Sequence, residues 1–492
     1  MSRNEQNATT VAETPGAAQA NDLVTAPIPA LIRRLAVPAS VGFFFNTMYN
    51  VVDTFWAGRF STDALAALSL TFPVFFVLLS LGSGFSTGAT ALIGNALGAG
   101  DRREAARTAS QGLVLSVLLS LVVMGVGYAA APSLFRLLGA TEEYLAICLE
   151  YMHVILAGSI VVLPFYMLNG VLNSQGDMKT FRDYLIFATV LNIVLDPWFM
   201  YGGFGLPAMG VRGIAVATVL MQTGGLIFLT YRARKTGLLF RSEGAHWTPD
   251  RRVLRAIFGQ GAPASLNMMT VALGIFVITY FLSEFGQTAV AAYGVATRIE
   301  QIILLPTIGL NVAVLTLAAQ NGGAGRFGRV RSCIRKSLFY GAIITAVGSV
   351  AMYLAAEPMM RLFSKDDEVV QIGAHYLRIA AFIEYAYVIM FVNTSALQGL
   401  KKPAFALWIG LYRQLAAPIA LFWLAMRVWN LGLDGIWYGV FGITWTAALV
   451  AVVYAQRVVG RMADGEIAPP AVADVSGPGA DPEAEPAGKG SP

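Results

Sequence analysis

Carboxylate and amide side chains recur at helical spacing in two segments that are otherwise apolar. Asn46, Asn50 and Asp53 stand at positions i, i+4 and i+7, so they share one face of a helix. Asn192 and Asp196 stand one turn apart in a second apolar segment. Because a charge inside a membrane is costly, both acids are candidates for a binding function. Their carboxylate and amide oxygens could bind a proton or hold a sodium ion, and we favour the proton.

The elements that carry these side chains are long apolar segments. Of the 492 residues, 56% are hydrophobic and 13% are charged, more apolar surface than a water-soluble domain can bury. Stretches of roughly 20 apolar residues, the length that spans a bilayer, recur about twelve times. We therefore expect an all-α integral membrane protein with twelve transmembrane helices near residues 31–57, 65–97, 105–129, 142–171, 181–201, 211–231, 253–283, 288–319, 329–355, 368–397, 404–427 and 433–457.

Basic residues alternate between the breaks that separate these segments. One set of breaks carries most of the arginine and lysine residues, among them Arg102, Arg103, Lys401 and Lys402, and the intervening set carries few. The positive-inside rule places the first set in the cytoplasm. We therefore expect a multi-pass protein of the bacterial plasma (inner) membrane with both termini cytoplasmic. Orientation then explains the net charge of +5, and no nucleic-acid partner is expected.

The expected domain boundaries follow from composition and from the charged break in the middle of the chain. Residues 1–28 and 461–492 lack the apolar residues that a folded segment needs, so we expect two disordered cytoplasmic tails. Residues 29–235 should form an N-terminal lobe of six helices, and residues 253–460 a C-terminal lobe of six. A cytoplasmic linker at 236–252 should join the two lobes.

The two halves of the sequence are an internal repeat. A shift of 225 positions aligns Pro38-Ala39-Ser40 with Pro263-Ala264-Ser265, and Gly98-Ala99-Gly100 with Gly323-Ala324-Gly325. Both halves would enter the membrane from the cytoplasm, so the repeat is parallel, about an axis along the membrane normal. Transporters built in this way place a cavity between two helical bundles and alternate its access by rocking them.

The repeat offers a control for the two aspartates. The position equivalent to Asp53 is Ile278, and the position equivalent to Asp196, with a slightly smaller shift, is Pro418. The duplicated scaffold therefore does not require either acid. Two structural alternatives stay open: the polar cluster around Asp53 could fix helix packing, and Asp196 could cap a helix end before Pro197.

The second half carries a different set of charged residues at membrane depth. Glu384 lies in the middle of the tenth expected span, and its counterpart in the first half is a serine, which favours a functional role. Glu300 in the eighth span follows Arg298 by two residues, so structural pairing and gating are both open. Arg378 and Arg413 complete the set, and the sequence does not decide whether they are functional or structural.

Four motifs resemble signatures of the multidrug and toxic compound extrusion (MATE) family. They are Asn46-x-x-Tyr49-Asn50-x-x-Asp53-x-x-x-x-Gly58, Gly94-Asn95-x-x-Gly98-x-Gly100-Asp101, Gln175-Gly176-Asp177, and Asn192-x-x-x-Asp196 with the later Gly213-Ile214-Ala215. The resemblance covers about residues 30–460. It implies two six-helix lobes around a central V-shaped cavity, and export of amphipathic, often cationic, organic compounds against inward proton or sodium flow.

The resemblance also bears on which residues form the site. It implies that the hydroxyl groups of Tyr151 and Thr218 belong to the pocket of the two aspartates, although both could be purely structural. Some branches of the family use an acid on the seventh span, whereas this chain has none before Glu284 at the outer end of that span. This departure argues against the branch that couples through the second half.

Two other classes of function stay open. A lipid-linked oligosaccharide or peptidoglycan-precursor flippase shares the fold superfamily, but its pyrophosphate substrates would need several basic cavity residues, and arginines at membrane depth are few here. A membrane-embedded enzyme needs a convergent catalytic set, and the sequence shows neither one nor a phosphate-binding loop for ATP. We therefore expect a monomeric antiporter of small organic cations or drugs, not an enzyme, with no cofactor or metal besides its coupling ion.

Overall fold

The computed structural model describes residues 22–240 and 244–467, and the regular elements in these ranges are helices. Eleven of them are long and apolar enough to cross a membrane, and one bent pair of helices makes up a twelfth span. The prediction of an all-α membrane protein with twelve spans is confirmed. The expected tail segments 1–21 and 468–492 lie outside the described residues.

The first lobe consists of six long helices. They are α2 (Ile28–Phe60), α3 (Thr62–Gly98), α4 (Arg102–Leu137), α5 (Glu142–Ser174), α6 (Lys179–Tyr201) and α7 (Val211–Lys235). The turn between α3 and α4 shows how the sequence ends and restarts a helix. Gly100 adopts φ +82°, a conformation that glycine takes without steric cost, and Asp101 then accepts a hydrogen bond from the backbone N–H of Glu104.

The second lobe repeats this plan with two interruptions. Its helices are α8 (Arg251–Ser283), α9 (Gln287–Gly323), α10 (Phe327–Leu354), α11 (Ala356–Arg361), α12 (Asp367–Ala380), α13 (Glu384–Gly399), α14 (Ala404–Leu411), the π-helical turn η1 (Tyr412–Ala416), α15 (Ala417–Arg427) and α16 (Gly432–Ala463). The helices α3 and α9 have 37 residues each, and both their first and last residues are 225 positions apart. The internal repeat therefore extends to the helix bounds.

The expected position of Glu384 in the middle of a continuous tenth helix was wrong. The span bends by 51° between α12 and α13, and Glu384 is the first residue of α13. Residues 381–383, which contain neither proline nor glycine, form the turn. The bend places this carboxyl group at the start of a helix, where backbone N–H groups lack intrahelical partners and favour negative charge.

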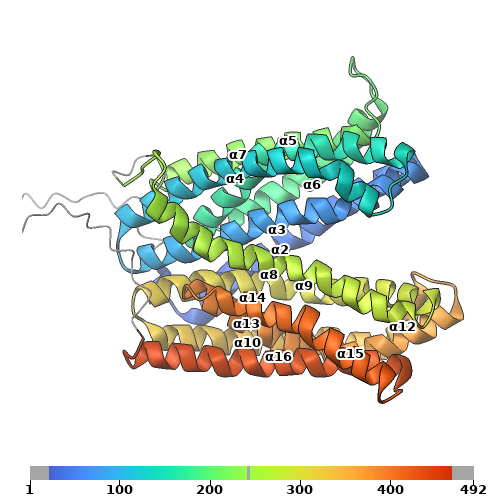
Figure 1. Cartoon of the computed structure of the whole chain (residues 1–492). Coiled ribbons are helices and arrows are strands. Elements are labelled where there is room, and N and C mark those ends of the chain that lie inside the picture. Colours follow the sequence, from blue (N-terminus) through green and yellow to red (C-terminus); the bar gives the residue numbers. More distant parts are fainter. Residues whose placement is uncertain (1–21, 241–243, 468–492) are drawn as a thin grey trace, which may run out of the picture.

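The two lobes approach each other at one end of the molecule and separate toward the other (Figure 1). We call the first the basic end, defined by the turns at residues 99–101 and 324–326, and the second the opposite end. Between the lobes, the Ser40 hydroxyl donates to the carbonyl of Pro306 at 2.8 Å, and a Cβ added to Gly84 would lie 2.3 Å from the backbone nitrogen of Ser265. These contacts lie in the halves of the helices nearer the basic end, so the lobes diverge toward the opposite end.

The segments that precede α2 and α8 pack against the basic end. Residues 22–27, which the sequence assigned to the polar tail, include the fully buried Leu23, and Arg329 donates to the carbonyl of Ala26 at 2.7 Å. In the linker between the lobes, the Gln111 amide donates to the carbonyl of Thr248 at 2.8 Å. Each of these segments is therefore held by side chains of a neighbouring lobe.

Candidate functional site

A buried polar cluster lies in the first lobe, where α2 packs against α6. The side-chain amide of Asn192 donates to Oδ1 of Asp53 at 3.1 Å and to Oδ1 of Asp196 at 2.8 Å. Asn192 and Asp196 are fully buried, and Asp53 is 8% exposed. The structure therefore brings together the two aspartates that the sequence singled out, although they are far apart in the chain. One amide group joins both carboxyl groups across two helices.

This cluster has acceptor atoms without donors. Oδ1 of Asn192 and Oδ2 of Asp196 are buried and accept no hydrogen bond from any described residue. A buried acceptor left unpaired costs free energy, and a buried negative charge without a counter-charge costs more. The binding of a proton or a small cation would reduce both penalties, so the arrangement is suited to reversible ion binding.

Hydroxyl groups surround the two carboxyl groups. Tyr151 is 6% exposed and Thr218 is 2% exposed. Tyr151 and Tyr49 both lie within electrostatic reach of Asp53 and Asp196, and the Tyr49 hydroxyl neighbours that of Thr218. The hydroxyls of Tyr49 and Thr218 make no hydrogen bond of normal geometry with a described residue. The site therefore has further polar atoms free to reorient around a bound ion.

Tyr49 is a member of this pocket to which the sequence analysis gave no role. Tyr49 lies four residues before Asp53 on α2, and this spacing puts both side chains on one helix face. Spacing along one helix face was also used to group Asn46 and Asn50 with Asp53, so the signal was present. A tyrosine in an apolar helix is more often a packing residue, and the sequence alone did not separate the two roles.

Asn46 and Asn50 share the helix with Asp53 but do not join its carboxyl cluster through their amides. The Asn50 side chain donates to the carbonyl of Asn46 at 2.8 Å, one turn back on the same helix. The carbonyl of Asn50 accepts from the Thr54 hydroxyl at 2.9 Å. Among the described residues, the Asn192 side chain is therefore the amide that hydrogen-bonds the two acids.

A second buried cluster lies in the other lobe. The Tyr376 hydroxyl donates to Oε2 of Glu300 at 3.1 Å, so the repeat partner of Tyr151 hydrogen-bonds an acid. Glu300 is 5% exposed and Glu384 is fully buried. Oε1 of Glu300 and both carboxyl oxygens of Glu384 lack hydrogen-bond partners among the described residues. The second lobe thus also holds two acids with unsatisfied acceptors.

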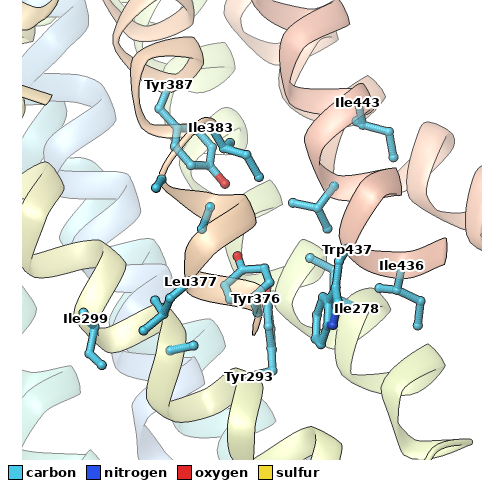
Figure 2. Close-up of a cluster of buried hydrophobic side chains, with 14 of the residues drawn as sticks. Ile278, Tyr293, Ile299, Tyr376, Leu377, Ile383, Tyr387, Ile436, Trp437 and Ile443 are labelled. Carbon is cyan, nitrogen blue, oxygen red and sulfur yellow. The ribbon is translucent and has the colours of Figure 1, made fainter. Parts of the chain in front are cut away.

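Aromatic rings enclose this second cluster. The rings of Tyr376 and Trp437 lie 4.8 Å apart between centroids, and Tyr293 stacks on Trp437 at 5.9 Å. Figure 2 shows these three rings gathered at one level of the lobe, with Tyr387 farther along the bent span. Ring faces attract positive charge, so these surroundings suit a cation as well as apolar packing.

The arginines near these glutamates do not pair with them as the sequence allowed. Glu300 accepts its hydrogen bond from a tyrosine rather than from Arg298. Glu384 accepts no hydrogen bond from the part of the chain that the structure describes, which includes Arg378 on α12. Arg413 instead lies over the ring of Tyr387, with 5.1 Å from Cζ to the centroid. Arg413 lies in the π-helical turn η1, and its guanidinium group is within electrostatic reach of Glu300. This nearby positive charge distinguishes the second cluster from the first.

Comparison with known proteins identifies the family. The MatE family model matches residues 38–198 and 263–423, once in each lobe and over more than half of the chain. The chain belongs to the MATE family. MATE proteins are multidrug efflux transporters, so the resemblance seen in the sequence motifs is confirmed at this level.

Curated MATE relatives match most of this chain. The probable multidrug resistance protein YoeA of Bacillus subtilis (strain 168) is 28% identical over 82% of this chain and 88% of its own length. An FAD transporter of Shewanella oneidensis is 26% identical over 80% of this chain and 86% of its own length. A solved MOP superfamily transporter from Pyrococcus furiosus Vc1 is 25% identical, covers 91% of this chain and 99% of its own, and superimposes with a TM-score of 0.84.

Proposed function

We propose that this MATE protein is a secondary antiporter that exports amphipathic organic compounds in exchange for protons. The observation that carries the proposal is the first-lobe cluster, in which one asparagine amide joins the carboxyl groups of Asp53 and Asp196 and two buried acceptors have no donor among the described residues. A proton on this pair would satisfy an acceptor and reduce buried charge. Its binding and release can therefore be linked to the arrangement of the helices that hold the pair.

The helix α2 is the element that would transmit this change. Asp53 lies in its half nearer the opposite end, whereas Ser40, nearer the basic end, donates to the carbonyl of Pro306 in the other lobe. Pro38 interrupts the same helix and offers a bending point. Protonation at Asp53 would favour one lobe arrangement over the other, and this differential affinity supplies the population shift of a rocker-switch cycle.

Protons are the favoured coupling ion, with sodium as the alternative. Sodium is held by several oxygen ligands, and no hydrogen bond among the described residues links the Asn50 amide to Asp53 or Asp196, because its N–H donates to the carbonyl of Asn46. A proton needs only one or two acceptors, which Asp196 and Asn192 supply. A sodium ion would have to recruit the hydroxyls of Tyr49, Tyr151 or Thr218 as well.

We further propose that the second-lobe cluster contributes to substrate binding. Arg413 partly compensates the charge of Glu300, so a proton is less needed there, and the group of aromatic rings that includes Tyr376 and Trp437 suits flat organic molecules. Amphipathic cations are the proposed cargo.

The lipid-linked flippase is not favoured, because the reported relatives are named as multidrug or FAD transporters. Both lobes lie in one chain, so we propose a monomer as the working unit.

The test of the proposed function is export driven by one ion gradient at a time. Purified protein is reconstituted in vesicles with a panel of fluorescent organic cations, plus FAD as an anionic candidate. We expect an imposed proton gradient to drive transport of cationic dyes without sodium. Transport driven by a sodium gradient alone would contradict proton coupling, and no vectorial movement under either gradient would contradict the antiporter itself.

We propose that the basic end faces the cytoplasm. The breaks rich in arginine and lysine gather there, including Arg103 and Lys402, whereas Thr141 and Lys365 lie at the opposite end. Single cysteines are introduced at these four positions after the buried Cys148 and Cys333 have been replaced. An impermeant thiol reagent should label positions 141 and 365 on intact cells, and positions 103 and 402 only after the membrane is opened. The reverse pattern would overturn the orientation.

A further inference from the structure

Two hydrogen bonds cross between the lobes at the basic end, and the internal repeat relates one to the other. The side-chain amide of Asn95 on α3 donates to the carbonyl of Gly399 at 2.7 Å, and that of Gln320 on α9 donates to the carbonyl of Ser174 at 2.7 Å. The two donors are 225 positions apart, and so are the two acceptors. The bonds therefore form a pseudo-symmetric pair, with one donor and one acceptor from each lobe.

The acceptors are carbonyl groups at helix ends. Ser174 is the last residue of α5, and Gly399 is the last residue of α13. The final carbonyls of a helix have no intrahelical partner, so they must bind a side chain or water. In this structure each lobe supplies the cap for a helix of the other lobe. Asn95, Gln320 and Ser174 are all fully buried, so water does not replace these bonds while the lobes are together.

The glycines beside the donors make this close approach possible. A Cβ added to Gly98 would lie 2.0 Å from the carbonyl oxygen of Gln320, and a Cβ added to Gly323 would lie 2.0 Å from that of Asn95. These two glycines are also related by the shift of 225. The backbones of α3 and α9 therefore meet at the donor residues themselves, which holds both amides at their acceptors.

We infer that Asn95 and Gln320 form a clasp that holds the basic end closed and sets how often the transporter opens on that side. The inference rests on the proposed alternation of the lobes. If the basic end opens, both bonds must break together, because each joins one lobe to the other. A net hydrogen bond is worth enough to change an equilibrium roughly 2- to 10-fold, so losing both should favour the open arrangement by roughly 5- to 100-fold.

Each half of the clasp has a full N–H donor for the other lobe. The Asn95 amide group has two N–H donors, one for the carbonyl of Ala91 on its own helix at 2.7 Å and one for that of Gly399 at 2.7 Å. The Gln320 amide donates to Ser174 alone among the described residues. Loss of either amide should therefore move the equilibrium by a similar amount.

The experiment measures lobe separation by electron spin resonance distance measurements between spin labels. One pair, at positions 179 and 404, reports on the basic end, and another, at positions 141 and 365, reports on the opposite end; all four residues are exposed. The variants are Asn95→Leu, Gln320→Met and the double variant, which remove the donors with little change in volume. Asn393→Leu is the matched control, because this buried amide donates to Ile389 on its own helix.

The native protein is measured first, across pH and with a transported dye, to establish that two lobe arrangements are populated. We expect the clasp variants to lengthen the 179–404 distance and shorten the 141–365 distance, with the largest change in the double variant, smaller and similar changes in Gln320→Met and Asn95→Leu, and no change in Asn393→Leu. If the native protein alternates but the clasp variants keep its distances, the clasp is overturned while the proposed alternation stands. A native protein with one arrangement under all conditions would overturn the proposed alternation with it. Either single variant suffices if the double variant does not fold.

Discussion

Asp196→Asn and Asp53→Asn should each lower proton-driven export by at least about 100-fold. An asparagine has nearly the shape of a protonated aspartic acid but cannot release a proton, so the first-lobe pair would be fixed in one charge state. Moving a two-state equilibrium fully from one side to the other takes a differential affinity of about 10⁴-fold, and the bound proton is its proposed source. The measurement is dye transport into inverted vesicles under an imposed proton gradient.

The matched control for these variants is Asp434→Asn. Asp434 is an exposed acid in the first turn of α16 and pairs with His375 at 2.8 Å, far along the chain from the first-lobe cluster. The same chemical change there should leave export at the native rate. If both first-lobe variants export normally while Glu384→Gln is inactive, coupling belongs to the second lobe and the first-lobe account is wrong.

Gly84→Ala and Gly309→Ala should stop the lobes from closing at the basic end. The new Cβ would lie 2.3 Å from the backbone nitrogen of Ser265 in the first variant, and 2.3 Å from the carbonyl oxygen of Ala36 in the second. Overpacking of this kind costs about 1–3 kcal/mol, which changes the equilibrium between lobe arrangements by roughly 5- to 150-fold. We expect dye export to fall by at least about fivefold.

The thermal stability of each lobe should not fall in these variants, because alanine raises helix propensity over glycine by about 1 kcal/mol. The control is Gly125→Ala on α4, where an added Cβ meets no atom within 4 Å. Export should stay native in that variant, and its melting temperature should not fall. Native export by Gly84→Ala and Gly309→Ala together would show that the contacts at these glycines are not part of the transport cycle.

The sequence could predict the spans and the repeat because both depend on local properties. The length of an apolar run determines whether a helix can cross a bilayer, and the shift of 225 positions survives in the matched segments 38–198 and 263–423. The pairing of Asp53 with Asp196 was also predictable. Each is an acid inside an apolar helix of the same lobe, and the repeat shows that the scaffold does not need them.

The bend before Glu384 and the π-helical turn at Arg413 were not predictable in the same way. Residues 381–383 lack helix breakers, so the bend reflects packing within the second lobe rather than a local signal. The turn Tyr412–Ala416 has no proline or glycine inside it, and the one local signal is Pro418 just beyond it, which cannot donate to the carbonyl of Gln414. The hydrogen bond from the Asn50 amide to the carbonyl of Asn46 depends on the side-chain rotamer of Asn50, and spacing along a helix does not determine that rotamer.

The measurement that tests the central claim most directly is proton release on substrate binding. Purified protein in weakly buffered detergent solution is mixed with a transported organic cation while a pH indicator records the released protons. The account predicts release from the native protein and from Asp434→Asn, and none from the Asp53→Asn, Asp196→Asn double variant. Undiminished release from the double variant, or release that disappears only in Glu384→Gln, would contradict the claim that the first-lobe aspartates bind the coupling proton.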